Sequence, residues 1–133
     1  MARERFAGDD PREWIQRARS NLMQARNEHP DIYFEDLCFQ AQQAAEKALK
    51  GLILQYGGAF PRTHDIGYLI SLVEQHVGAI PDYLQDAAVL TRYAVATRYP
   101  GVIEPVTRDE YVEVLDLAVL LVEWVEQAIL ENQ

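Results

Sequence analysis

Two lysines on one predicted helix are the first residues of this sequence that could bind a ligand. Lys47 and Lys50 are the only lysines, and the other ten residues of the twelve lysines and arginines are arginine. Lysine carries a compact charge on a flexible stem, which the planar fork of arginine does not replace at a tight site. Glu46 stands next to Lys47 and forms an i,i+4 pair with Lys50. The pattern predicts that both lysines bind phosphate with Glu46 in support. The alternative is a solvated helix face with a surface ion pair, which contributes little.

A second group lies at residues 92–101, RYAVATRYPG, where arginines and tyrosines are concentrated. Arg92 and Tyr99 are two helical turns apart and project from one side, while Arg98 and Tyr99 fall where the helix should end. Arginine can bind phosphate bidentately, and tyrosine can stack on a base. The segment therefore predicts a nucleotide or phosphate site. The alternative is an ordinary helix end, with its arginines on the helix dipole and its tyrosines packed.

The third group is RTHD at residues 62–65, which precedes a predicted helix. His64 could act as a general base or donate to a phosphate, and a helix N-terminus nearby favours an anion. The alternative is that Thr63 or Asp65 caps the helix while His64 forms only local hydrogen bonds. We therefore regard His64 as a candidate catalytic residue and Asp65 as a supporting one.

Other kinds of site find no support in the sequence. The three histidines are far apart, there is one cysteine, and no glycine-rich phosphate loop is present, so we expect no metal and no cofactor. Cys38 lies on the apolar side of the central predicted helix and should be a buried small residue rather than a nucleophile. A lone cysteine also fits a reducing compartment.

The charge of the chain is acidic and uneven. The net charge is −9, which does not attract nucleic acid, so a local arginine patch would have to bind RNA or a nucleotide. Residues 1–28 are nearly neutral, whereas residues 104–133 hold eight acids and one arginine and suit either solubility or a basic protein partner. The N-terminus lacks the apolar segment of a signal peptide, and no apolar run is long enough to cross a membrane. We expect a cytoplasmic protein without membrane contact.

Helical periodicity dominates the sequence, and no strand pattern persists. The spacing predicts helices over roughly 11–28, 33–56, 63–76, 81–100 and 107–130. Asp31 could cap the second helix, and Thr107 with Glu110 has the spacing of a capping box. The last helix is so apolar that it must be central or meet another subunit. We predict an all-α, antiparallel up-and-down bundle of four to five helices, with a flexible tail at residues 1–10 and a single domain at 11–131.

The segments AQQAAEKALKGLI, THDI and RYP, in this order and spacing, resemble the HEPN domain, which is named for higher eukaryotes and prokaryotes nucleotide-binding. The resemblance covers roughly residues 11–130. It implies a helical bundle that usually forms a homodimer. Small stand-alone prokaryotic members commonly pair with a small nucleotidyltransferase, often in toxin–antitoxin arrangements, so the resemblance implies such a partner here.

Many HEPN proteins are metal-independent ribonucleases, and this chain departs from their motif at one position. The motif is an arginine, four to six residues, a histidine and, in one branch, a tyrosine two residues further on. Arg92 and Tyr99 match, but Thr97 occupies the place of the histidine, and no histidine follows His76. A threonine hydroxyl cannot act as a base near pH 7.

Three functions remain open. The first is a nucleotide-binding and assembly protein in which Lys47, Lys50, Arg92 and Arg98 neutralise phosphate and Tyr99 could receive a nucleotidyl group. The second is a ribonuclease toxin in which Arg92 stabilises the phosphorane and His64 is the base. The third is a structural adaptor without catalytic activity.

Overall fold

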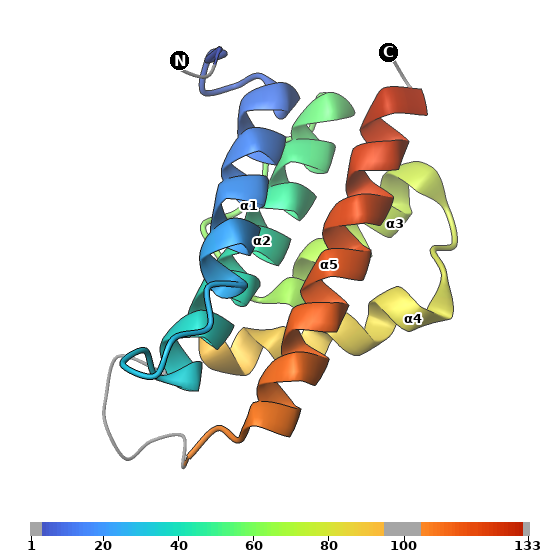
Figure 1. Cartoon of the computed structure of the whole chain (residues 1–133). Helices are drawn as coiled ribbons and strands as arrows, with labels where there is room; N and C mark the ends of the chain where they lie inside the picture. The colour runs from blue at the N-terminus through green and yellow to red at the C-terminus, as the bar shows by residue number, and fades with distance from the viewer. Residues whose placement is uncertain (1–3, 95–104, 132–133) are drawn as a thin grey trace.

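Three long helices lie side by side and carry most of the apolar residues (Figure 1). The computed structural model describes residues 4–94 and 105–131 of the chain. The three helices are α1 (Pro11–Ala25), α2 (Phe34–Gln55) and α5 (Arg108–Glu131). Helix α1 runs in the direction opposite to α2 and α5, and α2 packs against both of the others. The predicted all-α bundle is therefore confirmed.

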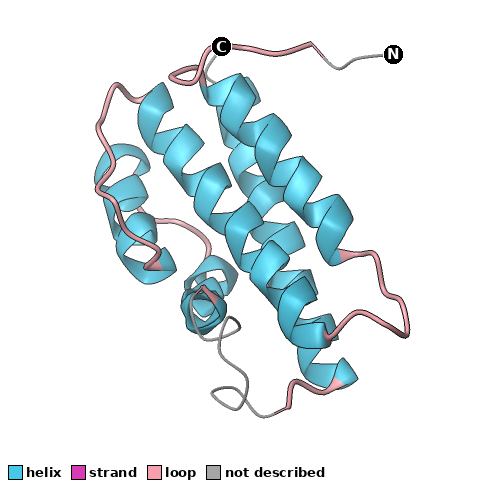
Figure 2. Cartoon of the chain, turned by 90° about the vertical axis from the view of Figure 1, so that its left-hand side faces the viewer, coloured by secondary structure: helices cyan, strands magenta, loops and turns pink. Residues whose placement is uncertain are grey.

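Shorter helices cover one side of these three. They are α3 (Ile66–Val77), α4 (Asp82–Gln85) and the 3₁₀ helix η1 (Asp86–Tyr93). Helix α3 packs on α2, and η1 crosses to contact α3, α2 and α5. Figure 2 shows that every regular element in the described part of the chain is helical. No helix within these residues has both the length and the apolar character needed to cross a membrane.

The centre of the fold is α2, because its small residues let neighbouring helices come close. Its alanines at 41, 44, 45 and 48 are completely buried. Gly51 continues this surface one turn later, where Trp14 of α1 packs directly against it. Cys38 is a buried free thiol, as predicted, and burial raises its pKa to about 12. The thiol is therefore protonated and unreactive at neutral pH.

The helix ends confirm some of the predicted caps and correct others. Asp65 caps α3 by accepting from the Tyr68 amide at 3.1 Å, and Thr107 accepts from the Glu110 amide at 3.1 Å. The prediction that Asp31 caps α2 was wrong. Helix α2 begins after Tyr33, which supplies no side-chain cap, while the Asp31 amide donates to His29.

The predicted continuous helix over 81–100 was also wrong in its described part. The α-helix ends at Gln85 and continues as the 3₁₀ helix η1 to Tyr93. The buried residues Leu84, Ala87, Leu90 and Tyr93 recur every three positions. A 3₁₀ helix has three residues per turn, so residues at this spacing form one straight stripe that faces the core. On an α-helix, with 3.6 residues per turn, the same residues would turn progressively away from the core.

Helix α5 buries one face and leaves apolar residues outside it. Seven of its residues are buried: Tyr111, Val114, Ala118, Leu121, Val122, Val125 and Ile129. Leu117 and Trp124 are only partly buried, and Leu120 keeps 43% of its surface exposed. The helix is therefore part of the core and also presents apolar surface to solvent.

Replacing Gly51 by alanine tests the close contact between α1 and α2. A Cβ at Gly51 would lie 2.9 Å from the Trp14 Cβ. We expect Gly51→Ala to lower the free energy of unfolding by about 1–3 kcal/mol, because overpacking outweighs the gain of about 1 kcal/mol in helix propensity. Gly67→Ala is the control, since a Cβ there meets Ala88 at an ordinary 3.4 Å. Chemical denaturation measures both, and equal stability of the two variants would contradict this packing.

Candidate functional site

A buried ion pair lies on the central helix. The Nζ of Lys50 is 2.9 Å from Oε2 of Glu46, and only 9% and 8% of these two side chains are exposed. The Lys50 ammonium also faces the Phe60 ring, with 5.2 Å between Nζ and the ring centroid. The i,i+4 pairing was predicted, but the alternative that placed it on a solvated face was wrong. The loop that follows α2 covers this side of the helix and shields the pair from water.

His64 and Gln42 complete the surroundings of Glu46. The Nδ1 of His64 lies 2.8 Å from Oε1 of Glu46, and the Gln42 amide donates to the same oxygen at 3.0 Å. The Gln42 amide also donates to the His64 carbonyl at 3.3 Å, which ties the loop to α2. Sequence reasoning missed Gln42. The signal was present, because Gln42, Glu46 and Lys50 repeat every four residues on one helix face.

The charge state of Glu46 follows from these contacts. Burial raises the pKa of the Glu46 carboxyl, but hydrogen bonds from Gln42, Lys50 and His64 outweigh burial and hold the pKa below its ordinary 4.5. The Glu46 side chain is therefore ionised, and its carboxylate accepts a hydrogen bond from the Nδ1–H group of His64. Within residues 4–94 and 105–131 the other ring nitrogen, Nε2, has no hydrogen-bond partner, and the side chain is 56% exposed, so Nε2 could exchange a proton with a ligand.

Lys47 lies apart from this cluster. Its Nζ donates to Oδ1 of Asn21 on α1 at 2.9 Å, and the Asn21 amide donates to Gln40 at 2.7 Å. Burial lowers the pKa of Lys47 and the positive charge of Arg17 lowers it further, which together outweigh the opposite effect of the Glu46 carboxylate. Within residues 4–94 and 105–131, no carboxylate forms an ion pair with Lys47. The two lysines therefore have different surroundings, although they are three residues apart.

Arg92 is exposed at the end of η1. Its guanidinium lies 5.5 Å from the centroid of the Tyr93 ring, and Tyr93 is buried with its hydroxyl bonded to Glu110 of α5. Burial, followed by Glu110, raises the pKa of Tyr93. The Ile66 amide donates to Thr91 at 2.9 Å, which joins the start of α3 to η1. The residues on either side of Arg92 are thus held by α3 and α5.

The structure brings together only part of the predicted site. Glu46, Lys50 and His64 form one cluster, while Asp65 faces the start of α3 as a cap. In the described part of the chain, Arg92 has no hydrogen bond or ion pair with that cluster or with Lys47. The predicted site residues Arg98 and Tyr99, and Thr97 in the place of the motif histidine, lie outside the described residues.

Removing the Glu46 carboxylate tests its part in the fold. We expect Glu46→Ala to lower the free energy of unfolding by about 3–5 kcal/mol at neutral pH, because Lys50 is left buried without a partner. The pKa of Glu46 is lowered in the folded state, so its contribution is present above the ordinary carboxyl pKa and is lost as pH falls through the lowered value.

Arg108→Ala is the control for Glu46→Ala. It breaks an ion pair with Glu28 in which 62% and 39% of the two side chains are exposed, so it should cost less than about 1 kcal/mol. Urea denaturation at several pH values measures both variants. Equal losses, or a loss for Glu46→Ala that persists at acidic pH, would contradict the buried pair.

Comparison with known proteins identifies the family to which this chain belongs. The family profile of the HEPN domain matches residues 11–128. The crystal structure of TT1696 from Thermus thermophilus has a TM-score of 0.78 and 39% identity, over 88% of this chain and 96% of that one. The crystal structure of ST0689, an archaeal HEPN homologue, has a TM-score of 0.70 and 31% identity, over 90% of this chain and 98% of that one. The search of curated proteins gave no match. On this evidence the chain belongs to the HEPN family.

Proposed function

We propose that this HEPN protein binds the phosphate of a nucleotide and assembles with a small nucleotidyltransferase in a toxin–antitoxin type of pair. The observation that carries the phosphate site is the state of Lys47. Its ammonium is partly withdrawn from water, is repelled by Arg17 and contacts only a neutral amide oxygen in the described part of the chain. A lysine with a purely structural role would gain from a carboxylate partner. Glu46 acts on Lys47 through its charge, too weakly to offset burial and Arg17, and a bound phosphate would add an anion in direct contact.

The other cations of the proposed site contribute unequally. Lys50 is neutralised by Glu46, so it adds little net charge for a ligand. Its role is structural, on the side of α2 that the following loop covers. Arg92 is exposed and lies near the Tyr93 ring, and in the described part of the chain its fork has no hydrogen-bond or ion-pair partner, so it could take a phosphate bidentately. Arg98 and Tyr99 follow it in the chain and enter the proposal through the family resemblance alone.

Replacing Lys47 by methionine separates ligand binding from stability. Without ligand, we expect Lys47→Met to unfold at the same temperature as wild type or a few degrees higher, because an unpaired, partly desolvated charge is removed. With AMP at saturating concentration, wild type should be stabilised and Lys47→Met should not. Thermal unfolding with and without AMP measures both effects.

Lys50→Met is the matched control for Lys47→Met. It should lower the melting temperature in the absence of ligand, because it leaves Glu46 without its cation, yet AMP should still stabilise it. If AMP stabilises Lys47→Met as much as wild type, Lys47 does not bind the phosphate. If AMP stabilises none of these proteins, the structural adaptor is the better account.

The proposed partners are a second copy of the chain and a small nucleotidyltransferase. HEPN domains often dimerise, and the partly exposed Leu117, Leu120 and Trp124 on α5 offer apolar surface for an interface. Native mass spectrometry of the chain alone should show a dimer. After mixing with a small nucleotidyltransferase and ATP, it should show a complex and an added AMP mass on this chain, because the Tyr99 hydroxyl would take the AMP group of ATP and pyrophosphate would leave. A monomer with no complex and no added mass would exclude this assembly.

A second candidate function is metal-independent RNA cleavage, and the Glu46–His64 contact favours it. A carboxylate that accepts from Nδ1 orients the imidazole and leaves Nε2 to remove a proton from a 2′-hydroxyl. The hydroxyl oxygen would then attack the neighbouring phosphorus, and Arg92 would stabilise the charge of the phosphorane. The P–O5′ bond would break, the 5′-oxygen would take the proton from Nε2 and leave as a hydroxyl, and a 2′,3′-cyclic phosphate would remain. His64 would replace the histidine that the motif lacks at Thr97.

An RNA-cleavage assay in the presence of EDTA tests this second function. We expect His64→Ala and Arg92→Ala each to reduce the rate by about a hundredfold or more, the scale of a lost general base or charge stabiliser. His29→Ala is the control, because the His29 ring accepts from the Asp31 amide and, among the described residues, has no hydrogen bond to Glu46, Lys50 or Arg92. Intact RNA with wild type, or unchanged cleavage by both variants, would exclude catalysis by these residues.

A further inference from the structure

A buried side-chain amide lies between the two helices α1 and α2. It belongs to Asn21 of α1, of which only 7% is exposed. Its Nδ2 group donates to Oε1 of Gln40 at 2.7 Å, and its Oδ1 accepts from Nζ of Lys47 at 2.9 Å. The contact with Gln40 fixes the orientation of the amide, because a reversed amide would turn its NH₂ group toward the ammonium, which only donates. Asn21 therefore gives Lys47 an acceptor that carries no charge.

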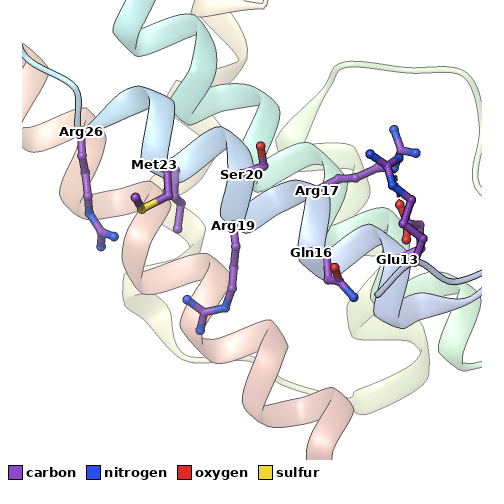
Figure 3. Close-up of a pocket in the computed structure, with 9 residues that line it drawn as sticks. Glu13, Gln16, Arg17, Arg19, Ser20, Met23 and Arg26 are labelled. Carbon is purple, nitrogen blue, oxygen red and sulfur yellow. Dashed lines mark hydrogen bonds and ion pairs between the residues drawn. The ribbon is translucent and has the colours of Figure 1, made fainter. Parts of the chain in front are cut away.

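The charges around position 21 would favour an acid there. Glu13, Arg17 and Asn21 follow one another at intervals of four residues, so they share one face of α1. Glu13 is the ion-pair partner of Arg17, whose side chain extends toward it in Figure 3. Burial and Arg17 lower the pKa of Lys47 more strongly than Glu46 raises it. An aspartate has nearly the shape of asparagine and would place a carboxylate in direct contact with Lys47. The neutral residue at this position therefore leaves electrostatic stabilisation unused.

We propose that Asn21 determines the class of ligand at Lys47, because its neutral amide holds the ammonium in place and leaves the positive charge for a phosphate. This inference rests on the phosphate site proposed above. An ammonium has three donors, and across residues 4–94 and 105–131 only Asn21 accepts from Nζ of Lys47. Two donors therefore remain, which suits two oxygens of one phosphate group. Asn21 is a positioning residue, since it acts on the ligand through Lys47.

Asn21→Asp tests this role, because it adds a carboxylate with little change of shape. Lys47 gains a charged partner, and Gln40 can turn its amide and donate to the same carboxylate. Without ligand, we expect the variant to unfold at the temperature of wild type or a few degrees higher. Its affinity for AMP should fall about tenfold or more, because the carboxylate neutralises Lys47 and repels the phosphate. Thermal unfolding and isothermal titration calorimetry measure the two effects.

Two variants and two further ligands serve as controls. Asn27→Asp adds the same charge at an exposed position beyond the end of α1 and should leave the affinity for AMP within about twofold. Asn21→Ser keeps position 21 neutral, so AMP should still stabilise it, although the lost hydrogen bonds lower its melting temperature. Inorganic phosphate should bind Asn21→Asp more weakly than wild type. Adenosine, which carries no phosphate, should not distinguish the two proteins.

The outcomes separate this inference from the phosphate site itself. If Lys47→Met loses AMP binding while Asn21→Asp keeps it, Lys47 binds the phosphate and the role of Asn21 alone is wrong. If AMP does not bind wild type, or binds Lys47→Met equally well, the phosphate site and this inference are both wrong. The role of Asn21 is also overturned if Asn21→Asp is less stable than wild type without ligand, or if Asn27→Asp or Asn21→Ser loses as much affinity as Asn21→Asp.

Discussion

The structure depends on a carboxylate buried on its central helix. Glu46 lies on α2, whose neighbouring positions are largely alanine, and an unpaired charge there would be very unfavourable. It is compensated by Lys50 one turn later, by Gln42 one turn earlier and by His64 from the loop. The same contacts hold the loop on α2 just before α3 begins. One buried charge thus links the centre of the bundle to its shorter helices.

This constraint assigns different roles to two neighbouring lysines. Lys50 is needed to neutralise Glu46, and its side chain is enclosed. Lys47 points to α1 instead, where Asn21 accepts from it and Arg17 raises the local positive potential. Stability alone does not explain that placement, because a neutral side chain would cost less to bury. The proposed ligand anion would give Lys47 a negatively charged partner, and the proposal depends on this difference between the two lysines.

Sequence reasoning predicted the helices well and the polar contacts only in part. The apolar stripe of α2, the buried Cys38 and the Glu46–Lys50 spacing are local patterns, and the structure confirms them. The burial of that pair depends on a loop that no local pattern positions. The 3₁₀ helix was not predicted, because apolar residues three positions apart occur on both α- and 3₁₀ helices and the local pattern does not separate the two. The Asn21–Lys47 contact joins residues of two helices, and their facing sides are set only when the bundle packs.

The most direct test of the central claim uses the two lysines as probes, since the chain has no others. Lysine labelled with ¹³C at Cε gives one NMR signal for each, and titration with AMP reports on both ammonium groups. AMP should shift the Lys47 signal and raise the pKa of Lys47, because a bound phosphate would place an anion in contact with the ammonium. The Lys50 signal should stay in place. A shift confined to Lys50, or no shift of either signal, would contradict the account.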